Sequence, residues 1–205
     1  MKEILPGVFH WTTHHEKIGV LVHSYYLEDA NGGVLVDPRV PEEGLEWFRG
    51  RGAPHDALLT NRHHYRHSDR FAGSFGLIVR CHQAGMHEFT KGEAVTPFEF
   101  GETFPNGFLA LEVGVLCPEE TAFHTVREGG ILFLGDAVIP WGGELGFAPE
   151  EHIGDDPPAI KAGIKSSIAR ILDEHECRHV CFAHGEPILE VGGERLRAFV
   201  VGRGG

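Results

Sequence analysis

Three apolar, strand-like runs of this chain each lead into a residue that can bind a metal or carry a proton. These residues are His63, Asp136 and His184, and each lies next to a turn or a glycine. Binding and catalytic groups concentrate where strands end in loops. If the three strands lie side by side, residues far apart in the sequence meet at one edge of the fold. A divalent metal site needs this kind of convergence.

The composition is that of a globular, acidic chain. Its 205 residues suffice for one sizeable core, and we expect a single domain over residues 1–205. The net charge of −12 opposes nucleic acids and anionic membranes, so neither is expected as a partner. No run of about 18 apolar residues is present, and the first residues lack the apolar stretch of a signal peptide. Sparse cysteines without a CxxC pair favour a cytoplasmic location.

Strand patterns fill the first third of the chain, and helical patterns become frequent later. The expected strands are 7–12, 20–27, 34–37, 56–60, 77–82, 108–113, 121–126, 131–136 and 179–183. The expected helices are 41–48, 68–75, 158–173 and 194–201. A hairpin turn is expected at Asn31-Gly32-Gly33. Hairpins followed by helices between later strands predict a mixed α/β (α+β) sandwich.

A loop with three histidines follows the strand that ends at Thr60. It reads Asn61-Arg62-His63-His64-Tyr65-Arg66-His67, and Ser68 is expected to cap the helix that follows. Imidazoles bind zinc and iron, and they transfer protons near neutral pH. Guanidinium groups stay protonated in proteins and offer only donors. The loop therefore combines metal ligands with side chains that oppose a metal.

These segments resemble the metallo-β-lactamase fold family over most of the chain. Leu5-Pro6-Gly7-Val8-Phe9 is similar to its opening strand, and the segment from Asn31 to Asp37 to its second hairpin, which ends in aspartate. Thr60 and the following histidines stand in the place of the T-H-x-H-x-D-H loop. Gly135-Asp136-Ala137 resembles the strand end that carries the metal-bridging aspartate, and Ala183-His184-Gly185 resembles the late histidine.

The resemblance implies a four-layer αββα sandwich with a metal site on one edge. Family members include hydrolases of thioesters, lactams, lactones and phosphodiesters, and iron enzymes that handle oxygen. The chain is short for this family, so a small substrate is expected rather than RNA. The sequence leaves the substrate and the oligomeric state open.

The histidine loop departs from the family pattern in either of two registers. Counted forward from Thr60, His63 takes the place of the second histidine and Arg66 that of the last. Counted back from the helix, His64 and His67 become the matching pair, and Arg66 replaces the aspartate. Both registers lose the aspartate.

A second departure concerns the ligand between the loop and Asp136. The family's histidine falls near Cys117, whose thiolate is an acceptable zinc or iron ligand. A guanidinium about 4 Å from a dication would repel it strongly. We therefore expect Arg66 to fill one of two metal positions and to pair with Asp136. At most one metal then remains, held by a subset of His63, Cys117, Asp136 and His184.

Two functions follow from this site. In the first, one divalent metal (zinc first, iron or manganese as alternatives) polarises a carbonyl or activates water, and the chain hydrolyses a small ester, thioester or lactone. Asp136 and Arg66 then belong to the catalytic centre, and His64 and His67 serve as general base or as partners of the ligands. In the second, no metal binds, and a retired enzyme binds a small anion or serves as a structural module.

The remaining histidines receive structural interpretations. His14 and His15 are expected in a hairpin loop, and His124 is expected to be a satisfied core residue. No partner is assigned to His10.

Overall fold

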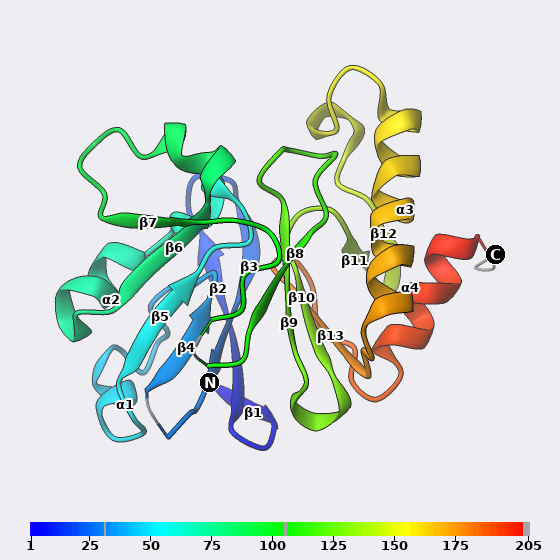
Figure 1. Cartoon of the computed structure of the whole chain (residues 1–205). Helices are drawn as coiled ribbons and strands as arrows, with labels where there is room; N and C mark the ends of the chain where they lie inside the picture. The colour runs from blue at the N-terminus through cyan, green and yellow to red at the C-terminus, as the bar shows by residue number, and fades with distance from the viewer. Residues whose placement is uncertain (31, 105, 203–205) are drawn as a thin grey trace. The chain divides into compact units, whose positions relative to one another are not determined.

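The computed structural model describes residues 1–30, 32–104 and 106–202. The chain divides into two compact units, residues 1–99 (unit 1) and residues 100–205 (unit 2), drawn in Figure 1. That the two units form a single domain stays a prediction. Asn31, expected to open a hairpin turn, lies outside the described residues.

Unit 1 is built on a seven-stranded sheet whose strands lie in sequence order. Its strands are β1 (Lys2–Leu5), β2 (Val8–His15), β3 (Val20–Leu27), β4 (Gly33–Val36), β5 (Pro54–Leu58), β6 (Ile78–His82) and β7 (Val95–Phe98). The strands from β1 to β4 pair antiparallel, and those from β4 to β7 pair parallel. Its helical segments are α1 (Glu46–Arg49), η1 (Arg62–Tyr65), α2 (Ser68–Phe75) and η2 (Gln83–Glu88).

The helices α1 and α2 lie on one face of this sheet (Figure 1). Phe48 of α1 and Phe71 of α2 are fully buried, and their ring centroids lie 5.2 Å apart. They share a core cluster with Leu35, Ala57 and Val79 of the sheet. Buried parallel strands are expected to be apolar on both faces, as β4 is, whereas β5 also carries the buried Asp56. This packing fixes the ends of β4 and β5 next to each other.

Unit 2 is built on a four-stranded sheet in the order β13-β10-β9-β8. Its strands are β8 (Leu109–Glu112), β9 (Thr121–Thr125), β10 (Ile131–Leu134) and β13 (His179–Phe182), and a separate hairpin consists of β11 (Ile139–Trp141) and β12 (Glu144–Gly146). β10 and β13 pair parallel, whereas the other neighbours pair antiparallel. Its helical segments are η3 (Arg127–Gly129), η4 (Glu150–His152), α3 (Pro157–Glu174) and α4 (Gly192–Val201).

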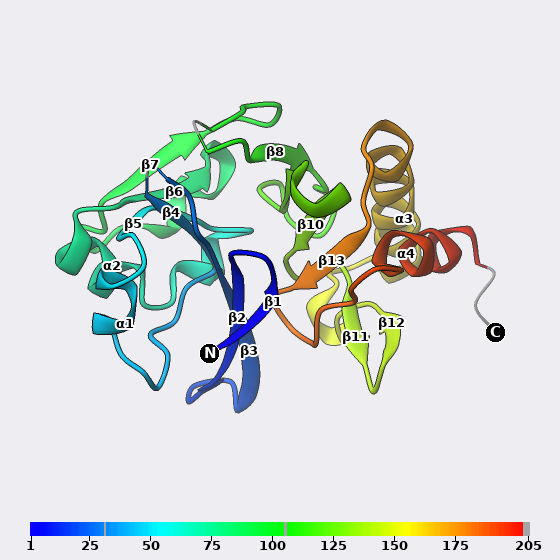
Figure 2. The same ribbon diagram turned by 90° about the horizontal axis from the view of Figure 1, so that it is seen from below.

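The chain segment between β10 and its parallel neighbour β13 contains the hairpin of β11 and β12, then η4, then the helix α3. Asp156 caps α3, because its side chain accepts a hydrogen bond of 3.1 Å from the N–H group of Ala159. Ile164, Ile168 and Ile171 recur at helical spacing and are buried in one cluster with the sheet. Figure 2 shows α3 and α4 side by side over one face of that sheet.

The strands and the long helices are largely those that the sequence predicts, and the differences are local. The helix α2 begins at Ser68 with His67 in the capping position, so the prediction that Ser68 caps this helix is wrong by one residue. The predicted helix over 41–48 is reduced to α1, because a turn occupies its first half. His14 and His15 belong to β2 and not to a loop.

The mixed α/β class predicted from the sequence is confirmed. Each unit contributes one sheet with helices on one face. The expectation that three strands lie side by side is wrong in one respect. β10 and β13 are neighbours in unit 2, but β5, which precedes the histidine loop, belongs to the sheet of unit 1. None of the helices in the described part of the chain combines the length and the apolar character that a membrane span requires.

Candidate functional site

The ends of β10 and β13 bring Asp136 and His184 together in unit 2. The two strands run parallel, with Leu134 opposite Phe182, and the N–H group of Ala183 continues the pairing with a bond of 2.8 Å to the Leu134 carbonyl oxygen. Asp136 Oδ1 consequently lies 3.2 Å from His184 Nε2. Both side chains are partly exposed. Two of the four predicted metal ligands therefore meet, and their role as ligands stays a prediction.

Gly185 allows the chain to turn directly after His184. Its φ of 118° lies in a region that side chains disfavour, and a Cβ atom there would stand 2.3 Å from Cγ of Pro140. The neighbouring imidazole is thus positioned by a turn that only glycine accommodates.

Glu120 is a site residue that the sequence interpretation missed. It lies just before β9 and is fully buried. Its Oε1 atom accepts hydrogen bonds from the N–H groups of Asp136 and Ala137, at 2.7 and 3.1 Å. Its Oε2 atom accepts a bond of 3.6 Å from the thiol of Cys117. Cys117, a predicted ligand, is thereby connected to the turn that carries Asp136.

Unit 1 contains a second group of functional side chains, centred on Asp37 at the end of β4. Asp37 Oδ1 accepts a bond of 2.9 Å from the Thr60 N–H group, and Oδ2 accepts one of 2.7 Å from the Thr60 hydroxyl. His64 Nδ1 lies 2.9 Å from the same Oδ2. Because β4 and β5 are parallel neighbours, their ends place these groups together. The carboxylate orients the imidazole of His64.

The electrostatics of Asp37 favour its charged form. Burial alone would raise its pKa, but the His64 imidazole, the Arg66 guanidinium and the hydrogen bond from Thr60 outweigh burial and hold the pKa of Asp37 below its ordinary value. A charged Asp37 carboxylate can only accept hydrogen bonds, so the Nδ1 atom of His64 carries a proton and donates to it. Nε2 is then the nitrogen of His64 that can take a proton or bind a metal.

The other two histidines of the loop have different surroundings. His63 is exposed, and its N–H group donates to Asn61 Oδ1 at 3.0 Å. His67 Nδ1 accepts a bond of 3.1 Å from the N–H group of Val40. Burial, followed by the charges of Arg39 and Arg70, lowers the pKa of His67, so its ring is neutral at pH 7. The proton of that neutral ring resides on Nε2, which suits His67 as a hydrogen-bond donor.

Arg66 is anchored within unit 1 by backbone oxygens. Its Nη1 atom donates to the carbonyl oxygens of His23 and Asp37, both at 2.7 Å. Arg66 and Asp37 both have positive φ angles, 48° and 47°, which non-glycine residues rarely adopt. Such backbone strain is typical of functional sites. The predicted pairing of Arg66 with Asp136 joins residues of different units and stays a prediction.

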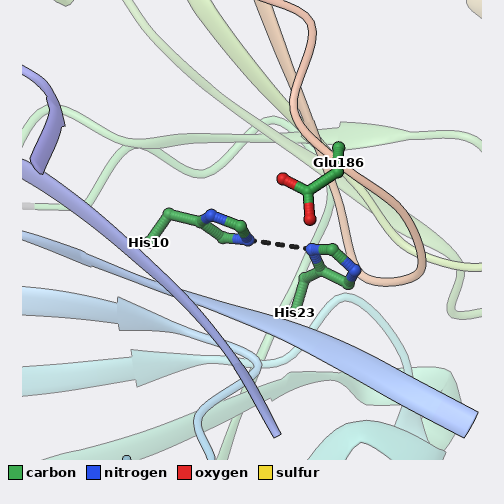
Figure 3. A group of neighbouring side chains, drawn as sticks. All are labelled: His10, His23 and Glu186. Atoms are coloured by element: carbon green, nitrogen blue, oxygen red, sulfur yellow. Dashed lines mark hydrogen bonds between the residues drawn. The ribbon is translucent and has the colours of Figure 1, made fainter. Parts of the chain in front are cut away.

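His23, whose carbonyl oxygen accepts a hydrogen bond from Arg66, also forms a side-chain pair with His10. His10 Nε2 and His23 Nδ1 are 2.8 Å apart, and both residues are buried. The dashed line in Figure 3 marks this hydrogen bond. The sequence assigns no partner to His10, and the structure shows that its partner is His23. β2 and β3 pair His10 with Tyr25, which makes His23 a diagonal neighbour of His10. Burial, followed by the charges of Lys2 and the N-terminus, lowers the pKa of His10 to about 4.

Comparisons with known proteins identify the fold. No protein-family model and no curated protein matches this sequence. A metallo-β-lactamase family protein from Thermus thermophilus is 19% identical, with 98% of this chain and 80% of that chain covered and a TM-score of 0.69. A metallo-β-lactamase from Hirschia baltica is 14% identical over 97% of this chain and 95% of that chain, with a TM-score of 0.69.

A third solved structure is similar over a comparable length. The protein TTHA1623, solved in a di-iron-bound form, is 24% identical over 92% of this chain and 99% of its own, with a TM-score of 0.66. These likenesses agree with the resemblance seen in the sequence, and this chain has the metallo-β-lactamase fold.

Proposed function

We propose that this chain is a metal-dependent hydrolase that uses one divalent metal to cleave a small ester, thioester or lactone. The fold supports this proposal, since the solved structures that share it include metallo-β-lactamases and a di-iron protein. A fold by itself does not determine chemistry, which depends on the side chains of the site.

The observation that carries the proposal is the contact between Asp136 and His184. Two ligands of a tetrahedral zinc ion, bound at about 2.0–2.2 Å, lie about 3.3–3.6 Å from each other. The separation of 3.2 Å between Asp136 Oδ1 and His184 Nε2 is close to the lower end of this range. Carboxylate, imidazole and the nearby thiol of Cys117 form a donor set that suits zinc or iron. Manganese, which prefers oxygen ligands, fits less well.

The chain supplies the remaining chemistry through residues with defined protonation. When bound, the metal would polarise the substrate carbonyl and make bound water more acidic. His64 is the proposed general base, because Asp37 holds Nδ1 and leaves Nε2 as the proton acceptor. His67, with its proton on Nε2, is proposed as a hydrogen-bond donor to the substrate and not as a base. His63 as a metal ligand stays a prediction, made less favourable by its exposure.

The single-metal part of the proposal depends on Arg66. A guanidinium held by two carbonyl oxygens contributes a permanent positive charge to the histidine loop, which lacks the family's aspartate in either register. That charge disfavours a second dication in this loop. With the aspartate missing, we expect activity toward substrates with good leaving groups, such as thioesters and lactones.

The alternative is a retired enzyme that binds a small carboxylate or phosphate without metal. Arg66 favours this alternative because guanidinium groups recognise such anions. Metal content separates the two functions. Protein purified without chelator and without added metal should carry about one equivalent of zinc, iron or manganese and should hydrolyse members of a panel of thioesters, lactones and esters. Protein that carries no metal, takes none up in titration and hydrolyses none of these compounds would contradict the proposed hydrolase.

A further inference from the structure

Glu120 is a fully buried carboxylate to which the proposed chemistry gives no role. Removing an ionised carboxylate from water costs several kcal/mol unless hydrogen bonds or charges replace the lost hydration. The residues that satisfy Glu120 therefore reveal what its position serves. Both of its oxygens are directed at residues proposed for metal binding or at their backbone.

The contacts of Glu120 converge on the turn that follows β10. Oε1 accepts the consecutive N–H groups of Asp136 and Ala137, at 2.7 and 3.1 Å, so a single oxygen clamps two successive peptide units. The parallel pairing of β10 with β13 ends just before this turn. Charge-assisted bonds from N–H groups to a carboxylate are roughly twice as strong as neutral ones. Glu120 therefore provides the turn with the hydrogen bonds that the sheet no longer provides.

The second oxygen of Glu120 holds the other candidate ligand of unit 2. Cys117 Sγ donates to Oε2 at 3.6 Å, within the range of a hydrogen bond from sulfur. One buried carboxylate thus fixes both the backbone that carries Asp136 and the thiol of Cys117. Cys117 and Asp136 are distant in the sequence, and Glu120 links them.

We infer that Glu120 is a positioning residue that sets the Asp136 carboxylate for metal binding and orients the Cys117 side chain, whose thiol would release its proton to solvent on binding a metal. This inference rests on the proposed function, since it assigns Glu120 a task at the same metal site. Glu120 does not touch the metal or the substrate in this role; it acts through the residues that do. Partners of metal ligands typically contribute about 10–100-fold to metal affinity.

The first test is independent of metal and of activity. Amide proton shifts and hydrogen-exchange rates of Asp136 and Ala137 are measured by NMR in the metal-free protein and in Glu120→Ala and Glu120→Gln. Glu120→Ala should lose the exchange protection of both amides, and Glu120→Gln should keep most of it, because its amide oxygen accepts the same bonds. Glu112→Gln, at the exposed end of β8, is the matched control and should change neither amide.

The second test measures zinc affinity by competition with a chromophoric chelator. Zinc affinity should fall about 10–100-fold in Glu120→Ala, and it should be largely restored in Glu120→Gln and unchanged in Glu112→Gln. Unaltered Asp136 and Ala137 amides, or an unaltered affinity in Glu120→Ala, would overturn the inference. If Glu120→Ala does not fold, Glu120→Gln provides the test. The backbone amide protons of Asp136 and Ala137 must then shift upfield, because a neutral acceptor forms weaker hydrogen bonds. Unchanged shifts would overturn the role of Glu120.

The two tests separate this inference from the proposed function. A wild-type protein that binds no zinc, iron or manganese would contradict the metal site and, with it, the task given to Glu120. Normal metal binding with unaltered amides in the variants would contradict Glu120 as a positioning residue and leave the metal site intact.

Discussion

Asp136 and His184 lie 3.2 Å apart, measured from Oδ1 to Nε2, because β10 and β13 are parallel neighbours that end in register. Each strand delivers its polar residue just beyond the last paired position. Ligands often gather outside the carboxyl ends of parallel strands. The proposed metal chemistry of this chain depends on this one relationship.

Replacement of Asp136 by asparagine should abolish metal binding and hydrolysis. The amide keeps the size of the side chain but removes the charge that a dication requires. Metal content and turnover of Asp136→Asn are compared with those of Asp155→Asn, which changes an exposed aspartate of the same unit. Equal metal content and turnover in Asp136→Asn and wild type would exclude Asp136 as a ligand.

The Asp136–His184 pair shows which part of the site the sequence can predict. Both residues follow short apolar runs and precede small residues, and this local pattern determines where a strand ends. This local pattern does not indicate which strands become neighbours in a sheet. The expected adjacency of the strands therefore held for β10 and β13 but not for β5, which pairs with β4 and β6 in another sheet.

A change at Asp37 should act on catalysis through His64. In Asp37→Asn the side-chain amide donates to Nδ1 of His64, so the proton of the neutral ring moves to Nε2, and His64 loses its role as a base. We expect turnover to fall at least about 10–100-fold in a protein that still folds. Circular dichroism and steady-state kinetics provide the measurement.

Asp56 offers a matched control for Asp37. It is equally buried in unit 1, and it also contacts a histidine and an arginine, His55 and Arg80. Asp56→Asn should destabilise the fold without a specific loss of turnover in the folded protein. Similar kinetics for Asp37→Asn and Asp56→Asn would contradict the role assigned to His64.

The stability of the protein should depend on pH through His10. Its pKa is lowered to about 4 in the fold, whereas an unfolded histidine titrates near about 6.5. Between these values the unfolded chain binds the proton that folded His10 refuses, so the contribution is fully present above pH 6.5 and is lost as the pH falls toward 4. The lost stability amounts to about 3 kcal/mol.

Denaturant unfolding of wild type and His10→Gln at several pH values measures this contribution. As the pH falls from 7 to 4, the free energy of unfolding of wild type should decrease more than that of His10→Gln. His14→Gln, which alters an exposed histidine on the same strand, should parallel wild type. Parallel curves for His10→Gln as well would contradict a His10 that stays neutral in the fold.

Substitution of Gly185 should disturb the metal site as well as the fold. Gly185→Ala places a Cβ atom 2.3 Å from Cγ of Pro140, which forces the turn beside His184 to shift. Gly142 is the control, because it also has a positive φ but no atom lies within 4 Å of the Cβ atom that an alanine would add. Urea denaturation should show Gly185→Ala to be less stable than Gly142→Ala by about 1–3 kcal/mol. Weaker zinc binding is expected in Gly185→Ala alone, and equal zinc affinities would contradict the positioning of His184 by this turn.

The parts of the site that the sequence could not predict depend on tertiary packing. Glu120 carries no motif, and two adjacent glutamates before a strand usually indicate a solvated loop. Only the fold brings its carboxylate to the N–H groups of Asp136 and Ala137. Similarly, the pairing of His10 with His23 follows from the register of β2 and β3, which the alternating pattern of the two strands leaves open.

Anomalous scattering from crystals of the metal-loaded protein tests the central claim most directly. We predict one peak per chain at the metal's absorption edge, within bonding distance of Asp136 and His184. A map of fully metal-loaded crystals with no peak at these two side chains, or with two equally occupied peaks there, would contradict the single-metal site.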